Sequence, residues 1–148
     1  MTTPLERVTA LVAPYLRDDL LEPRPLLSLA EFLDGNDVVG SIWCNVVPDP
    51  DDPASAPTPD EARAVLAAIE ERSEVTSVRV APGMFDDPDW PFADVVVVVT
   101  DAPPEDVRSW FPSAVEPDEV DEVDVAGDDH GLVDIGEPPH RLVVCWRD

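Results

Sequence analysis

The sequence contains no lysine: its nine basic residues are all arginine, whereas Asp and Glu together number 33. The formal net charge of −24 at pH 7 argues against nucleic acid and anionic membranes as partners, because both require clustered cations. A basic protein is the expected partner, because opposite electrostatic fields accelerate encounter. A GC-rich genome or a salt-adapted proteome would produce the same acidity, so the charge alone does not define a function.

Cysteine is also scarce. The two cysteines, Cys44 and Cys145, lie in separate apolar runs and not in C-x-x-C motifs. The N-terminal MTTPLERVTALVAPYL has no long apolar core, and no run approaches a membrane span, so we expect neither a signal peptide nor a membrane anchor. A cytoplasmic protein with free thiols is therefore predicted. A Cys44–Cys145 disulfide stays open as an alternative if the two strands are neighbours.

Motifs for catalysis and cofactor binding are missing as well. Without lysine and without a glycine-rich run there is no phosphate-binding loop. Ser41 lies in VVGSIW rather than in a G-x-S-x-G elbow, and the acidic surroundings disfavour a thiolate at Cys44. We therefore expect no cofactor. An enzyme is the less favoured interpretation.

Carboxylates are concentrated in EPDEVDEVDVAGDDHGLVDIG, Glu116–Gly136. An EF-hand loop does not fit there, because starting at Asp124 would put Ala126 and Asp129 at positions that need an oxygen ligand and a glycine. We therefore expect no metal. We interpret the segment as a solvated face or as an acidic docking surface for a basic partner. The residues of this predicted docking surface are Glu116, Asp118, Glu119, Asp121, Glu122, Asp124, Asp128 and Asp129.

Four tryptophans are many for a chain of 148 residues. Trp43, Trp90 and Trp110 could line an aromatic pocket for a small molecule, with His130 as the titrating group. The simpler interpretation is that these rings pack in the core and at the ends of strands. The sequence therefore leaves the aromatic pocket as an alternative to the docking surface.

Two helical segments are predicted in the N-terminal part. The first covers Pro4–Leu21, with a kink or break at Pro14, which lacks a backbone N–H and clashes with the preceding turn. The second covers Leu29–Asp34 and begins at a capping box formed by Ser28 and Glu31. The rival interpretation of the second is a strand that turns at the following Asp-Gly pair.

The remainder alternates between strands and helices. The run of five valines, Val95–Val99, is apolar on both faces and therefore belongs at the centre of a sheet that is covered on both sides. Further strands are predicted over 38–47, 75–81 and 141–147, with a short acid-edged strand beginning near Val120. Helices are predicted over 58–73 and 103–111.

This order predicts a single α+β domain, 1–148, with a ferredoxin-like (split β-α-β) sheet. To this core are added an N-terminal helical extension, 1–35, a Pro- and Asp-rich loop, 48–59, and an extra C-terminal strand. The ferredoxin-like form covers one sheet face with its two helices. The second face therefore needs the N-terminal helix, or a second copy of the chain in a homodimer.

Three stretches, SLAEFLDGND, GSIWCN and WPFADVVVVVTDAPPEDVRSW, resemble small uncharacterised bacterial proteins. The resemblance implies a free-standing bacterial domain with no known activity to transfer. The leading hypothesis is thus a non-enzymatic protein-binding module, for example an immunity-type inhibitor of a basic partner. The alternative is a small-molecule-binding domain or an enzyme with an aromatic-lined pocket.

Overall fold

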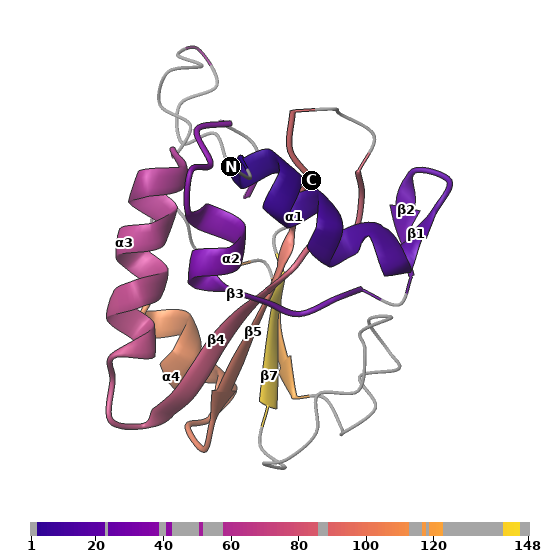
Figure 1. Cartoon of the computed structure of the whole chain (residues 1–148). Coiled ribbons are helices and arrows are strands. Elements are labelled where there is room, and N and C mark those ends of the chain that lie inside the picture. The colour runs from indigo at the N-terminus through magenta and orange to yellow at the C-terminus, as the bar shows by residue number, and fades with distance from the viewer. Residues whose placement is uncertain are drawn as a thin grey trace.

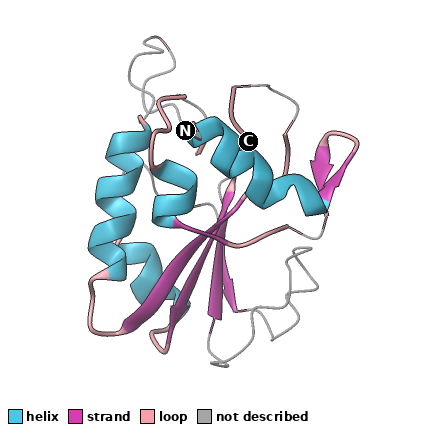
Figure 2. Ribbon diagram, in the orientation of Figure 1, coloured by secondary structure: helices cyan, strands magenta, loops and turns pink. Residues whose placement is uncertain are grey.

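The computed structural model describes residues 3–22, 24–38, 41–42, 51, 58–85, 89–112, 117, 119–122 and 141–145. The chain is a mixed α+β protein, as predicted (Figures 1 and 2). The helices are α1 (Pro4–Val12), the 3₁₀-helix η1 (Ala13–Tyr15), α2 (Leu29–Leu33), α3 (Pro59–Glu70) and α4 (Pro104–Ser109). The strands are β1 (Leu16–Arg17), β2 (Leu20–Leu21), β3 (Leu27–Ser28), β4 (Val75–Ala81), β5 (Val95–Thr100), β6 (Glu119–Glu122) and β7 (Arg141–Cys145).

The main sheet has five antiparallel strands in the order β3-β4-β5-β7-β6. The valine run forms the central strand β5, and all six of its residues are buried. Val96 is opposite Val80 of β4 on one side and Val144 of β7 on the other. The prediction of a central valine strand is confirmed, and β7 is the predicted additional C-terminal strand.

The two faces of β5 are buried against different parts of the chain. Val96 and Val98 belong to a large core cluster that also contains buried side chains of α1, α2, α3 and α4. Val95, Val97 and Val99 form a second cluster with Ala81, against which Leu26 packs. The N-terminal helix lies on the first face, so the idea that it covers the second face is wrong. Leu26, in the extended chain before β3, packs on the second face instead.

The ferredoxin-like detail is compatible with the described residues. The β4–β5 hairpin lies between α3 and α4 in the predicted order. Ile42 forms a parallel bridge with Ala93, which is the direction expected of the first strand. Most of the predicted strand over 38–47, and most of the loop over 48–59, lie outside the described residues. Along β5 itself the second neighbour is β7, which pairs antiparallel with it.

The start and end of α2 follow the sequence signals. The Ser28 Oγ accepts a hydrogen bond from the Glu31 N–H at 3.0 Å, and the Glu31 carboxylate accepts one from the Ser28 N–H at 2.8 Å. This reciprocal capping box confirms the predicted helix over the rival strand. Gly35 follows the helix with a φ of 75°, a conformation that glycine adopts without steric cost.

The first helix is shorter than predicted. It ends at Val12, and Pro14 lies in the 3₁₀-helix, so the predicted break is confirmed. The extension of the helix to Leu21 is wrong, because β1 and β2 form a hairpin there. The hairpin is held by a distant segment: the Leu21 N–H donates to the Gly83 carbonyl at 3.1 Å and the Phe85 N–H to the Asp19 carbonyl at 2.8 Å. It projects from the end of α1, away from α3 (Figure 1).

Candidate functional site

The hairpin β1–β2 forms one side of a small antiparallel ribbon. Leu20 forms a bridge with Met84, and Met84 forms a second bridge with Phe92. Directly opposed residues of an antiparallel ribbon lie on the same face. Because Arg17 is paired with Leu20, one row runs across the ribbon through Arg17, Leu20, Met84 and Phe92. We call these four residues the Leu20 row.

Exposed apolar surface is concentrated at this ribbon. Among the described residues, the exposed large hydrophobic side chains are Leu16, Leu20 and Met84, at 38%, 45% and 40% exposure. Leu20 and Met84 belong to the Leu20 row, whereas Leu16 is paired with the buried Leu21 and so lies on the opposite face of the hairpin. The exposed face therefore carries two neighbouring apolar side chains, and the other face contributes to the core.

A cavity of about 410 Å³ adjoins the Leu20 row, and Leu20, Met84 and Phe92 form its apolar wall. Its polar wall is an ion pair, in which the Arg24 Nη1 donates to the Asp94 Oδ1 at 2.7 Å and to the Ala81 carbonyl at 3.3 Å. The cavity thus combines an apolar wall with a carboxylate that is 41% exposed.

Gly83 fixes the position of the guanidinium in this wall. A Cβ built at Gly83 would lie 2.6 Å from the Arg24 Cζ and 2.8 Å from its Nη2. Any larger residue would therefore displace the arginine head group. Within the described part of the chain, the Nε and Nη2 atoms of Arg24 and the Oδ2 atom of Asp94 have no hydrogen-bond partner.

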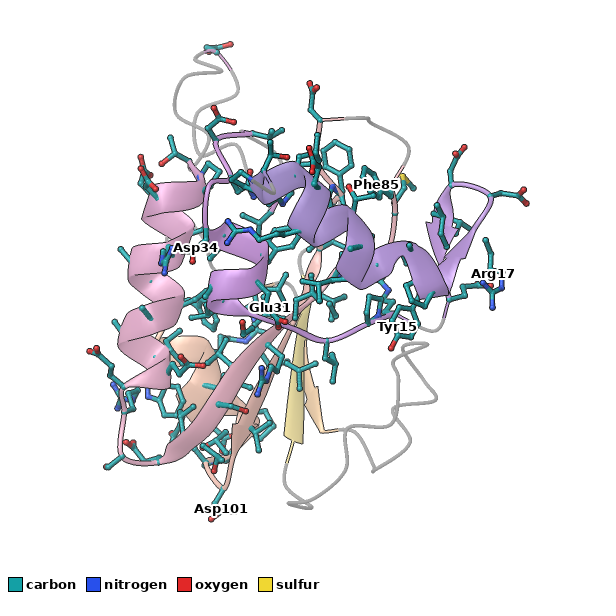
Figure 3. All side chains as sticks on the ribbon, in the orientation of Figure 1. Tyr15, Arg17, Glu31, Asp34, Phe85 and Asp101 are labelled. Carbon is teal, nitrogen blue, oxygen red and sulfur yellow. The ribbon has the colours of Figure 1, made fainter. Side chains whose placement is uncertain are left out.

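Two further cavities lie elsewhere. One of about 510 Å³ lies between α1 and α2, where Arg7, Glu31 and Asp34 provide its charged wall. The other, of about 430 Å³, is at the start of α3, beside Asp37 and Asp60. Figure 3 shows Glu31 and Asp34 on the helical side of the molecule, far from Arg17 on the hairpin. Both cavities are walled largely by charged and small residues.

The predicted acidic docking surface coincides with the edge of the main sheet. Strand β6 is the last strand in the sheet order and pairs with β7. Its backbone carries Glu119, Asp121 and Glu122 of the predicted set. The other five members, Glu116, Asp118, Asp124, Asp128 and Asp129, lie outside the described residues.

Two tryptophans of the predicted aromatic pocket, Trp90 and Trp110, are separated. Trp90 is 2% exposed, packs edge-on against Phe32 and donates its indole N–H to the Phe32 carbonyl at 3.1 Å. Trp110 is half-buried beyond the other end of β5, under the Arg72 guanidinium at 4.3 Å. Neither ring lines any of the three cavities. Trp43, His130 and Cys44 lie outside the described residues.

Glu74 is a carboxyl with a shifted pKa. The hydrogen bond from its own backbone N–H is the largest cause and lowers the pKa below its ordinary value. Desolvation comes next and opposes it, and the Arg72 guanidinium and the Ser73 hydroxyl lower the pKa further. Arg72 lies 3.3 Å from Glu74 and also covers Trp110. This arrangement orders the turn between α3 and β4, and it has no contact with a cavity wall.

Two negative findings concern the described residues alone. No three His, Cys, Asp or Glu side chains among them are grouped so that they could hold a metal ion. No helix in that part of the chain is both long enough and apolar enough to span a bilayer.

Sequence reasoning missed the Leu20 row, Arg24 and Asp94. The signal available was the pair Asp18-Asp19 after the proline break, because consecutive aspartates favour a turn over a helix. Asp18 indeed adopts a positive φ of 57° in the hairpin turn. Nothing in the local sequence indicates that Met84 lies next to Leu20.

Comparison with known proteins identifies relatives over nearly the whole chain. The sequence model described as "Uncharacterized protein YfbO family" matches residues 3–145. The chain is 42% identical to "Uncharacterized protein YfbO" of Escherichia coli (strain K12) over 149 aligned positions, which cover 99% of each chain. No solved structure matches the chain.

Proposed function

The chain belongs to the YfbO family, and from that premise we propose that it is a small protein-binding module whose partner is a basic protein. The observation that carries this proposal is the large excess of acidic over basic residues. Asp and Glu exceed arginine by 24 residues, from 33 and 9, so carboxylates dominate the polar surface. A field of this size accelerates encounter with a cationic partner and repels nucleic acid and anionic membranes.

The ion pairs of the described residues support the proposal. Arg24, Arg63 and Arg72 each have a carboxylate within 4.0 Å, namely Asp94, Asp34 and Glu74. These cations therefore face carboxylates of their own chain, and their charge is locally compensated. The large excess of carboxylates stays uncompensated by the protein itself and is available to an external cation.

The edge strand β6 is the proposed centre of the docking surface. Its Glu119, Asp121 and Glu122 lie at the outer border of the main sheet, near the start of the acidic segment. An immunity-type inhibitor that covers the cationic cleft of a basic toxin is one concrete form of this function. In that form the acidic segment would provide the electrostatic rim of the interface.

The experiment is capture of basic proteins on the immobilised chain, followed by calorimetric titration of the purified partner between 50 and 500 mM NaCl. Added salt shortens the Debye length, from about 10 Å at 0.1 M to about 3 Å at 1 M, and so screens the attraction between opposite charges. The affinity should therefore fall steeply as the salt concentration rises. Neutralising the strand with E119Q/D121N/E122Q should weaken binding by about 0.6–3 kcal/mol if each carboxylate contributes about 0.2–1 kcal/mol.

A matched control neutralises three exposed carboxylates in or next to helices α3 and α4, in the variant E61Q/E71Q/E105Q. It makes the same change in net charge away from β6 and should weaken binding less. Affinity that does not respond to salt would contradict the proposal. Equal losses in both variants would show that net charge acts without a docking surface at β6.

The alternative is a small-molecule site walled by Trp43, Trp90 and Trp110. Its support is weaker, because Trp90 is enclosed in the core and Arg72 covers Trp110. A small apolar ligand would instead find its best site at the cavity beside the Leu20 row.

A further inference from the structure

We infer that the Leu20 row and its cavity form a second, apolar contact for a partner protein, and that the occupant is a basic amphipathic segment. Such a segment would insert one apolar side chain between Leu20, Met84 and Phe92 and place a Lys or Arg against Asp94. This inference rests on the proposed function, because it names a contact for the same basic partner. It assigns that contact to residues distant in sequence from the acidic segment.

The exposed apolar surface is the first argument. Leu20 and Met84 are 45% and 40% exposed and are neighbours across a backbone bridge. They therefore form one contiguous apolar patch and are not isolated exposed side chains. Contiguous apolar surface rimmed by polar groups is typical of interaction sites. The half-buried Phe92 continues the same row toward the cavity.

The shape of the cavity is the second argument. A volume of about 410 Å³ is near the lower end of the roughly 300–1,000 Å³ that is usual for binding pockets. Ala93 contributes a small side chain to the lining, and Gly83 contributes none, which leaves room for an inserted group. A side chain that fills such a pocket is the usual anchor of a protein interface.

The charges around the ribbon select the occupant. The hairpin turn carries Asp18 and Asp19, Glu22 follows β2, and all three are exposed. Two cations lie in the same region: Arg17 donates to two nearby backbone carbonyls, and Arg24 is paired with Asp94. With Asp94 included, four carboxylates surround the patch against these two cations, so its rim has a net negative charge. An apolar segment that also carries cations complements both properties.

A second copy of the chain fits this site poorly. Each copy has a formal charge of −24, and the rim of one hairpin would face the carboxylates of the other. Like charges brought together at an interface oppose association. A basic segment of a different protein meets no such repulsion and is therefore the occupant that the charges favour.

The test is an NMR titration of the ¹⁵N-labelled full chain with three capped dipeptides. Ac-Leu-Arg-NH₂ carries both properties, Ac-Leu-Glu-NH₂ reverses the charge and Ac-Ala-Arg-NH₂ removes most of the apolar group. We expect Ac-Leu-Arg-NH₂ to cause saturable shifts of the backbone amides of Gly83, Met84 and Ala93. The other two peptides should bind at least about fivefold more weakly.

Variants assign the effect to the site. Leu20→Ser should weaken binding of Ac-Leu-Arg-NH₂ about tenfold, because it removes the apolar wall. Leu16→Ser is the matched control, since Leu16 has similar exposure in the same hairpin but lies on its opposite face. Asp94→Asn should weaken Ac-Leu-Arg-NH₂ about fivefold and leave Ac-Leu-Glu-NH₂ unweakened.

Three results would overturn the inference. They are equal affinity for the three peptides, equal effects of Leu20→Ser and Leu16→Ser, and shifts at Gly83 and Ala93 that depend on protein concentration without peptide. The last result would place a second copy at the site.

The partner itself separates this inference from the proposed function. Capture that survives Leu20→Ser but fails in E119Q/D121N/E122Q leaves the function standing and removes the hairpin contact. If no basic partner with salt-sensitive binding is found while the peptide still binds, the hairpin contact stands and the proposed function is contradicted.

Discussion

The surroundings of Phe32 and the β1–β2 hairpin both contain large apolar side chains. Those around Phe32 are closed to water, whereas those at the hairpin are open to it. Around Phe32 the polar groups are satisfied inside the protein. The Phe32 carbonyl accepts hydrogen bonds from the Trp90 indole and from the Asn36 amide, which also donates to the Ser41 hydroxyl at 2.8 Å. At the hairpin, Leu20 and Met84 stay exposed.

The difference separates stability from recognition. Each apolar group buried around Phe32 stabilises the folded state, and the hydrogen bonds in this region offset the cost of burying polar atoms. The parts of Leu20 and Met84 that stay exposed do not contribute to folding, and their burial lowers the free energy only when another molecule covers them. The closed region therefore specifies the fold, and the open region is the place where substitutions can change binding while the fold persists.

The largest expected effect is in the closed region. Trp90→Ala removes a buried ring and should lower the free energy of unfolding by about 3–5 kcal/mol. Trp90→Phe is the milder control: it keeps an aromatic ring near Phe32 and loses the indole donor. That loss should cost about 1 kcal/mol, because the Phe32 carbonyl still accepts from Asn36. Urea unfolding of both variants measures the two costs, and equal costs would contradict the predicted contribution of the buried ring.

Two glycines provide an intermediate effect. Gly35→Ala puts a Cβ 2.4 Å from the Pro4 Cγ at a positive φ, so it should cost about 1–3 kcal/mol. Gly83→Ala meets only the end of the Arg24 side chain, which can move away from Asp94, so it should cost less than about 1 kcal/mol. Urea unfolding midpoints rank the two variants, and the Arg24 Nε resonance reports the displaced guanidinium. A Gly83→Ala variant as unstable as Gly35→Ala would show that the cavity wall belongs to the core.

The smallest effect on stability is expected at the open face. Leu20→Ser changes an exposed side chain and should alter the free energy of unfolding by no more than about 0.5 kcal/mol. Thermal and urea unfolding of this variant, beside the wild-type chain, check the value. A loss above about 2 kcal/mol would mean that Leu20 stabilises the fold and is not free for a partner.

Much of the fold was predictable because its signals are local. The capping box at Ser28 and Glu31 starts α2, Thr58 caps α3, and the valine run became the central strand β5. The helix predicted to reach Leu21 failed because the ribbon it joined lies more than sixty residues away in sequence. The Leu20 row was unpredictable for the same reason.

By itself the sequence determined the acidity, the helix caps, the proline break and the burial of the valine run, since each depends on composition or on neighbours within a few residues. Only the tertiary structure decided that β7 lies beside β5, that α1 shares a core cluster with the other helices, and that Met84 and Phe92 adjoin Leu20. Strand pairing joins segments through backbone N–H and C=O groups that every residue except proline has, so its partners are selected by packing of the whole chain.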